Sequence, residues 1–153
     1  MKPPAAARRA LRRRVVAAWL APVVLFGTVA GVTAWLRRPP PVSQTFRVTM
    51  SDYAFAPNAF TVSEGQRVRF VFHNASGQTH EALIGDTAAQ AAHDRLMRTH
   101  GDSMAGMDLP VVDVAPGRTA TLDYTFAHRG TLLIGCHQPG HYAQGMRATV
   151  IVQ

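Results

Sequence analysis

Apolar and polar residues alternate along much of the chain beyond residue 44, with the period of two that is typical of strands with one buried face. The clearest alternation runs from Arg67 to His73, where Val68, Phe70 and Phe72 are expected to face a core. The segments that we expect to form strands are 45–50, 55–62, 67–73, 82–84, 111–114, 119–126, 131–134 and 148–152. Short strands in such a series, separated by turn residues, predict an all-β sandwich.

One segment, residues 87–100, departs from this alternation. Its apolar positions include Ala88, Ala91, Ala92, Leu96 and Met97. These positions repeat at the spacing that places side chains on one face of a helix. We therefore expect a short helical insertion at residues 87–100 of the sandwich.

The N-terminal part of the chain has the layout of a membrane-targeting sequence. Residues 1–14 carry six cations, and residues 15–36 form an apolar run of 22 residues without a charge. A helix of that length can span a bilayer, and Trp19 and Trp35 near its ends favour the membrane interface. The positive cluster predicts a cytoplasmic N-terminus and an exported domain, on the outer face of the cytoplasmic membrane or in the periplasm. An uncleaved anchor and a signal peptide cleaved near Ala34 both stay open, and the length favours the anchor.

The charge of the chain follows the same division. We expect a basic segment at 1–14, a hydrophobic helix at 15–36, a Pro-rich linker at 37–44 and one domain at 45–153. The formal net charge is +7, yet half of the sixteen basic residues lie within the first 38 residues. The other 115 residues carry eight arginines and nine acids, a net charge of −1. No basic patch remains for DNA or RNA, so we expect no nucleic-acid partner.

A short segment near the C-terminus holds the candidate chemistry. Cys136 is the only cysteine, and His141 and Met146 follow it at intervals of five residues in a segment that contains Pro and Gly. One thiolate, two imidazoles and a weak axial thioether form the trigonal sites of blue copper proteins. The second imidazole has an upstream candidate in His80. This set predicts one type 1 copper, and coordination would also occupy a thiol that is otherwise exposed to oxidation in an exported domain.

The pattern Cys136-x4-His141-x4-Met146 with an upstream His80 resembles the cupredoxins, the plastocyanin and azurin type of copper protein. The opening from Phe55 through Phe70, and the Asn74 that follows it, also resembles the first strands of this family. The resemblance covers about residues 45–153. It implies a Greek-key β-sandwich with the metal near one end, and it implies His80, Cys136, His141 and Met146 as ligands. For Asn74 we predict a supporting role, in which its side chain ties the His80 loop to the Cys136 loop.

His137 raises the question of an enzyme. Multicopper oxidases carry a His-Cys-His triplet that links a blue site to a trinuclear centre, but Gly135 stands in the first histidine position here. Paired histidine motifs for further copper ions are absent from the sequence. We therefore interpret His137 as a structural loop residue and expect no enzymatic activity.

A cluster of soft donors lies between the fourth and fifth expected strands. Its members are His93, Met97, His100, Met104 and Met107. Imidazole and thioether groups suit Cu(I), so the cluster is a candidate auxiliary copper site. The plainer interpretation is an amphipathic helix with packed methionines and solvated histidines, and we favour it because methionine commonly fills gaps in cores.

Two functions remain open from the sequence. The favoured one is single-electron transfer through Cu(II)/Cu(I) in an exported, membrane-tethered domain, with a redox partner docking near His141. Such encounters bury little surface, so a small docking patch would suffice. The alternative is a copper-binding protein for delivery or resistance, which would use the same site together with the cluster at 93–107.

Overall fold

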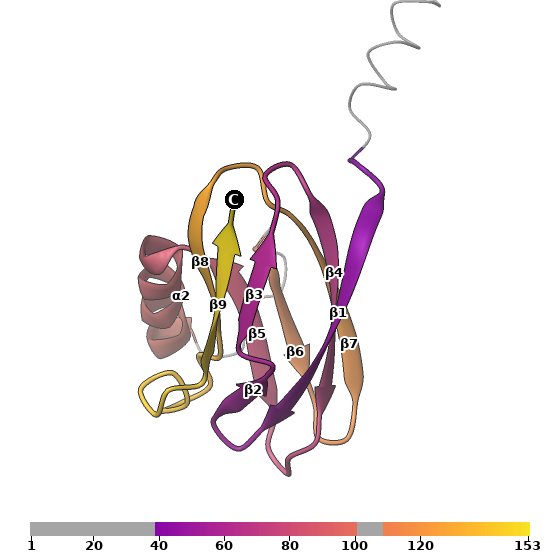
Figure 1. Ribbon diagram of the computed structural model, residues 1–153. Helices are drawn as coiled ribbons and strands as arrows, with labels where there is room; N and C mark the ends of the chain where they lie inside the picture. Colours follow the sequence, from indigo (N-terminus) through magenta and orange to yellow (C-terminus); the bar gives the residue numbers. More distant parts are fainter. Residues whose placement is uncertain (1–38, 101–108) are drawn as a thin grey trace, which may run out of the picture. The chain divides into compact units, whose positions relative to one another are not determined.

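The computed structural model describes residues 39–100 and 109–153, which fold into two facing β-sheets with one helix on the outside (Figure 1). The strands are β1 (Val42–Ser51), β2 (Ala54–Ala56), β3 (Ala59–Val62), β4 (Arg67–Asn74), β5 (His80–Gly85), β6 (Val111–Val114), β7 (Thr119–Thr125), β8 (Gly130–Gly135) and β9 (Arg147–Val152). Each expected strand segment overlaps at least one of them. The segment 55–62 divides into β2 and β3, which belong to different sheets.

The two sheets are mixed. One has the strand order β2-β1-β4-β7 and the other has the order β3-β9-β8-β5-β6. β1 pairs in parallel with β4, and β3 pairs in parallel with β9, while the remaining pairs are antiparallel. Neighbours in a sheet are therefore often distant in sequence, as in Greek-key arrangements. The predicted all-β sandwich is confirmed.

Aromatic side chains fill the space between the sheets. Val68, Phe70 and Phe72 of β4 are fully buried, as their alternation predicted. The ring of Phe70 lies 5.4 Å from that of Phe60 on the other sheet, in an edge-to-face arrangement that aromatic pairs favour. The outward-facing side chains of the same strand include His73, which is exposed. This packed core gives the loops at the ends of the sandwich a rigid base.

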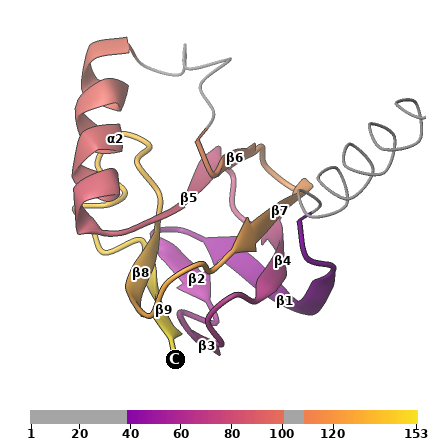
Figure 2. The same cartoon turned by 90° about the horizontal axis from the view of Figure 1, so that it is seen from above.

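The helix α2 (Thr87–His100) has the bounds that the apolar spacing predicted. It packs on the outside of β5 and β8, on the side of the molecule away from β1 and β4 (Figure 2). The amide of Gln90 fastens it there, because Gln90 Nε2 donates hydrogen bonds to the carbonyl oxygens of Leu83 at 3.2 Å and of Leu133 at 3.1 Å. These carbonyls belong to the two neighbouring strands, so one side chain joins the helix to both.

The predictions for the N-terminal segment lie outside the described residues. The basic segment at 1–14 and the hydrophobic helix at 15–36 fall there, as does the start of the linker. Among residues 39–100 and 109–153, no helix has the length and apolar character needed to cross a membrane.

Candidate metal centre

Three of the four predicted ligands meet at one end of the sandwich. His80 is the first residue of β5, Cys136 directly follows β8, and His141 lies in the ligand loop, residues 136–146, which joins β8 to β9. In Figure 1 this loop, in yellow, lies at the same end as the turn between β1 and β2. β5 and β8 pair antiparallel in adjacent positions of one sheet, which places His80 beside Cys136. Among the described residues, these three form the single group of histidine, cysteine or acidic side chains close enough to hold one metal ion.

The donor atoms already face one another. Nδ1 of His80 lies 3.2 Å from Nδ1 of His141, and the Cys136 sulfur lies 3.4 Å from Nδ1 of His141 and 3.9 Å from Nδ1 of His80. Metal bonds of about 2.0–2.3 Å to imidazole nitrogen and thiolate sulfur would give a ligand triangle of similar size. Two imidazoles and one thiolate in a triangle are the donor set of blue copper sites. The three side chains therefore fit copper without a change of fold.

The two ligand histidines favour the neutral form. Burial is the main cause that lowers the pKa of both rings, and at His80 the neighbouring His141 adds to the effect. A neutral imidazole offers a lone pair to a metal, whereas a charged one does not. Ser76 Oγ lies 2.8 Å from Nε2 of His80, so a proton on Nε2 can be donated to Ser76 while Nδ1 keeps its lone pair.

Met146 lies next to this triangle and is fully buried. Its backbone amide donates to the carbonyl of His141 at 3.1 Å, and its own carbonyl accepts from the amide of Cys136 at 3.2 Å. These two bonds close the ligand loop on itself. Gly145 precedes Met146 with a φ of 95°, a conformation that other residues rarely adopt. There is space for a side chain at this position, because a Cβ would have no neighbouring atom within 4 Å beyond the adjacent residues. The glycine is thus needed for its backbone angle.

Asn74 is fully buried and holds the loop that leads to His80. Its Nδ2 donates to the carbonyls of Gln78 at 2.7 Å and Val114 at 2.8 Å, and its Oδ1 accepts from the amide and the hydroxyl of Ser76 at 2.9 Å. The predicted connection to the Cys136 loop is wrong. The side chain has four hydrogen-bond positions, and the His80 loop and the end of β6 take all of them.

The Cys136 thiol is held in an apolar, buried position. The backbone N–H of Glu81 donates to its sulfur at 3.3 Å. Burial raises the pKa of the Cys136 thiol to about 11, with the Glu81 hydrogen bond acting in the opposite direction. In the metal-free protein the thiol is therefore protonated at neutral pH, and a metal must displace that proton to bind.

Copper binding is therefore expected to release about one proton per ion at pH 7, because Cys136 starts protonated and both histidines start neutral. Because the thiol loses its proton on binding, the apparent affinity for copper should rise about tenfold per pH unit between pH 7 and 9. Titration calorimetry in buffers of different ionisation enthalpy measures the proton count. An affinity that does not change over this pH range would show that the thiol is already ionised in the metal-free protein.

Behind the ligands lies a buried polar pair that the sequence did not reveal. Glu81 and His93 are each about 2% exposed, and His93 Nε2 lies 2.8 Å from Glu81 Oε1. Burial raises the pKa of Glu81, while the interaction with His93 lowers it. The favoured view of the helix histidines as solvated is thus wrong for His93, because its ring contacts the residue that follows the ligand His80.

The rest of the soft-donor cluster is only partly placed. Met97 is half-buried on α2, while the side chain of His100 and both Met104 and Met107 lie outside the described residues. The prediction of an auxiliary copper site built from all five stays a prediction. His93 is engaged with Glu81 through one ring nitrogen, and only Nδ1 of its ring lacks a partner.

His137 has a structural partner, as expected of a loop residue. Its Nε2 lies 2.8 Å from Gln90 Oε1, and its ring stacks on Tyr142 with centroids 4.5 Å apart. A Cβ at Gly135 would collide with Gln90 Oε1 and the ring of Tyr142, so both side chains would have to move to admit another residue there. The ring of Tyr53 packs edge-on against that of His141, with the ring centroids 5.1 Å apart, so Tyr53 covers that ligand.

Comparison with known proteins gives a consistent result. A family model described as copper binding proteins of the plastocyanin/azurin family matches residues 42–153. The copper-resistant cuproprotein CopI of Rubrivivax gelatinosus is 38% identical over 111 residues, covering 72% of this chain and 67% of that protein. The protein of the same name from Pseudomonas aeruginosa is 31% identical over 139 residues, covering 72% of this chain and 77% of that protein.

A solved structure agrees with these relatives. The auracyanin of Roseiflexus castenholzii has a TM-score of 0.64 and 26% identity, covering 73% of this chain and 98% of that one. The family match and the His80, Cys136, His141 donor set together identify copper as the cofactor, in a site of type 1 character with Met146 nearby. The chain belongs to the plastocyanin/azurin family of copper-binding proteins.

Proposed function

We propose that this chain is an exported cuproprotein that contributes to copper resistance, and that its centre acts by exchanging single electrons. The observation that carries the proposal is the buried, preformed His80, Cys136, His141 triangle, in a chain similar to two proteins named copper-resistant cuproproteins. The basic segment at 1–14 and the apolar run at 15–36 support export and a membrane tether.

The residues around the triangle favour electron exchange because they are fixed before the metal arrives. Copper supplies a centre that alternates between Cu(II) and Cu(I). Ser76 holds the ring of His80, the Glu81 amide holds the Cys136 sulfur, and the backbone of Met146 holds the ligand loop. Little rearrangement then accompanies a change of charge, which keeps the barrier to electron exchange low.

Electron exchange also explains a role in copper resistance better than the storage of copper ions does. The described residues place one group of ligands around one metal position, in a chain of 16.6 kDa. A store with that capacity would need one chain for every copper ion, whereas a redox centre acts repeatedly. We further propose that the chain exchanges electrons without enzymatic activity of its own.

The second candidate is an electron carrier with no role in resistance. The auracyanin likeness favours it, since that structure is described as dithionite-reduced and so concerns a redox-active protein. A redox partner would then dock at the end of the sandwich near His141, where Tyr53 covers the ring. Both candidates use the same ligands and differ in what supplies and accepts the electron.

The test is expression of the full chain in a copper-sensitive bacterium, with the copper concentration that halves growth as the readout. The unaltered chain should raise that concentration, Cys136→Ser should not, and His128→Ala, at an exposed histidine away from the site, should behave as the unaltered chain. No protection by the unaltered chain would overturn the role in resistance and favour the carrier.

A second variant separates electron exchange from storage. Met146→Gln keeps the two histidines and the thiolate but supplies an oxygen donor in place of the thioether, which lowers the reduction potential of the copper. Protection should fall with the potential although copper is still bound. Full protection by Met146→Gln would show that resistance works by binding alone and would overturn the electron-exchange part.

A further inference from the structure

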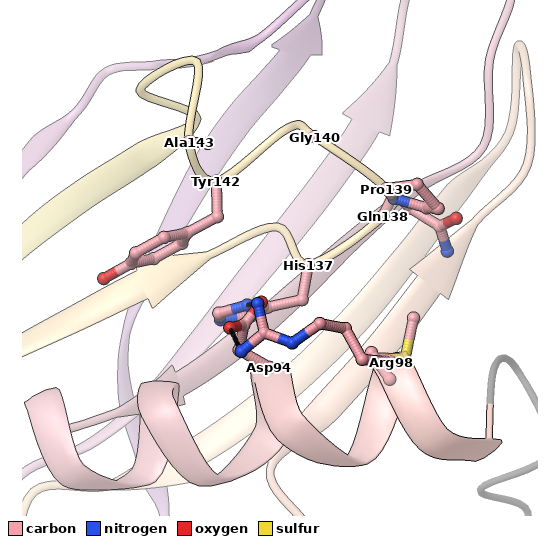
Figure 3. Close-up of a pocket in the computed structure, with 9 residues that line it drawn as sticks. Asp94, Arg98, His137, Gln138, Pro139, Gly140, Tyr142 and Ala143 are labelled. Atoms are coloured by element: carbon pink, nitrogen blue, oxygen red, sulfur yellow. Dashed lines mark ion pairs between the residues drawn. The ribbon is translucent and has the colours of Figure 1, made fainter.

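A cavity of about 570 Å³ lies between α2 and the ligand loop (Figure 3). Asp94, Met97 and Arg98 line it from the helix, and His137 and Tyr142 line it from the loop. In the close-up, the ring of His137 points towards Asp94 on the helix below it. The cavity is separate from the His80, Cys136, His141 triangle, although His137 directly follows Cys136.

The orientation of Gln90 decides which nitrogen of His137 carries the proton. Gln90 Nε2 faces the carbonyl oxygens of Leu83 and Leu133, so the amide oxygen must be the atom that faces His137. Oε1 can only accept, and His137 Nε2 therefore donates to it at 2.8 Å. In this tautomer Nδ1 of His137 carries a lone pair.

Among residues 39–100 and 109–153, no donor binds that lone pair. Nδ1 of His137 is buried and is one of two buried side-chain nitrogens among the described residues that lack a hydrogen-bond partner. Asp94 Oδ1 lies 3.6 Å from this nitrogen, but it is another acceptor and lies beyond hydrogen-bond distance. A buried acceptor left unsatisfied costs about 1–3 kcal/mol. A cation between the two atoms would satisfy both.

We propose that this cavity binds a second metal ion, a soft monovalent cation of the Cu(I) class, through His137 Nδ1, the Met97 thioether and the Asp94 carboxylate. Asp94 and Met97 are three residues apart on α2, so their side chains share one face of the helix. Imidazole and thioether donors select Cu(I) over the hard cations, which prefer oxygen ligands alone. The proposed site shares Met97 with the candidate cluster at 93–107 and adds His137 and Asp94, which were not predicted as ligands from the sequence.

Among the described residues that line the cavity, Arg98 is the one with a cationic side chain. Its guanidinium pairs with Asp94 Oδ2, which leaves Oδ1 directed at His137. The Arg98 side chain is 68% exposed, so water screens its charge. Arg98 should therefore weaken metal binding by competing for Asp94, without preventing it.

The inference concerns binding alone and does not depend on the proposed role in resistance. Ag(I) is a suitable probe because it shares the charge and softness of Cu(I) but does not change oxidation state during the titration. The protein is the full chain with Cu(II) already in the type 1 site, carrying His100→Ala, Met104→Leu and Met107→Leu to remove the soft donors that follow Met97 in the sequence. Equilibrium dialysis then counts the Ag(I) bound.

We expect one tight equivalent of Ag(I) beyond the Cu(II), with the blue absorption retained. Met97→Leu and Asp94→Asn should each weaken this binding at least tenfold, whereas Arg98→Gln should leave it equal or tighter. The blue absorption also reports that each variant is folded. The ¹⁵N signal of His137 Nδ1, measured in the reduced, diamagnetic protein, should shift as Ag(I) binds.

Two results would overturn the site. One is Ag(I) binding that Met97→Leu and Asp94→Asn leave unchanged, which would place the ion elsewhere on the chain. The other is loss of the blue absorption in proportion to the Ag(I) added, which would mean that Ag(I) displaces the type 1 copper. An Nδ1 signal of His137 that does not shift would likewise exclude this ring as a ligand.

Discussion

Replacing Cys136 by serine should abolish the blue absorption of the copper-loaded protein completely. The band arises from charge transfer between the Cys136 thiolate and copper, and a serine hydroxyl does not ionise at neutral pH to replace it. Copper affinity should fall by more than the roughly 10–100-fold that loss of an outer partner of a ligand costs. Visible absorption and a copper titration of purified Cys136→Ser measure both effects.

The metal-free variant should still fold. Cys136 is fully buried, and its sulfur accepts a hydrogen bond from the backbone N–H of Glu81 at 3.3 Å. A serine oxygen is an acceptor for the same N–H, so the position keeps its hydrogen bond. His128→Ala is the matched control, because that histidine is exposed and away from the triangle. Persistent blue colour in Cys136→Ser, or its loss in His128→Ala, would contradict the ligand assignment.

The sequence predicted the fold and the ligand triangle because each depends on local patterns. Alternation placed Val68, Phe70 and Phe72 in the core, and they are buried. Cys136 and His141 lie five residues apart in one loop, so a short stretch of chain is enough to bring them together. His80 was named as an upstream candidate for the second imidazole and was also implied by the resemblance, but no local spacing places it, since its approach to Cys136 results from the pairing of β5 with β8.

The surroundings of the ligands were harder to predict, because they depend on contacts between distant segments. Asn74 was recognised as a support, but its partner Val114 is 40 residues away and cannot be read from a local pattern. Gln90 lay in a segment identified only as a helix, and His93 was considered only as an auxiliary copper ligand or a solvated side chain. Ser76 precedes His80 by four residues within a loop, and this polar position close to a ligand is a signal that could have suggested its role.

Helix α2 therefore does more than cover a sheet. It places Gln90 against His137 and His93 against Glu81, and these two partners are the residues that directly follow the ligands Cys136 and His80. The side chain of Glu81 also accepts from the backbone amide of His137 at 3.4 Å. Through these contacts the helix holds the backbone that follows His80 and the backbone that follows Cys136.

His93→Leu tests this support and should destabilise the metal-free protein strongly at pH 7. The substitution leaves the Glu81 carboxylate about 2% exposed without its partner at 2.8 Å. Removing one member of a buried pair costs about 3–5 kcal/mol, because the remaining charge is not compensated. Urea denaturation of the metal-free chain measures the loss as a lower transition midpoint.

The pH dependence of the His93→Leu variant identifies the cause. Burial already raises the pKa of Glu81, and removal of His93 also removes the interaction that lowers it. The folded variant then holds a proton that the unfolded chain releases above a pH of about 4.3, so its stability should fall as pH rises from there. The double variant Glu81→Gln with His93→Leu has no such group. It should recover much of the lost stability at pH 7 and lose the added pH dependence. If the single and double variants were equally unstable between pH 5 and 8, the loss would come from the cavity left by the imidazole and not from the buried charge.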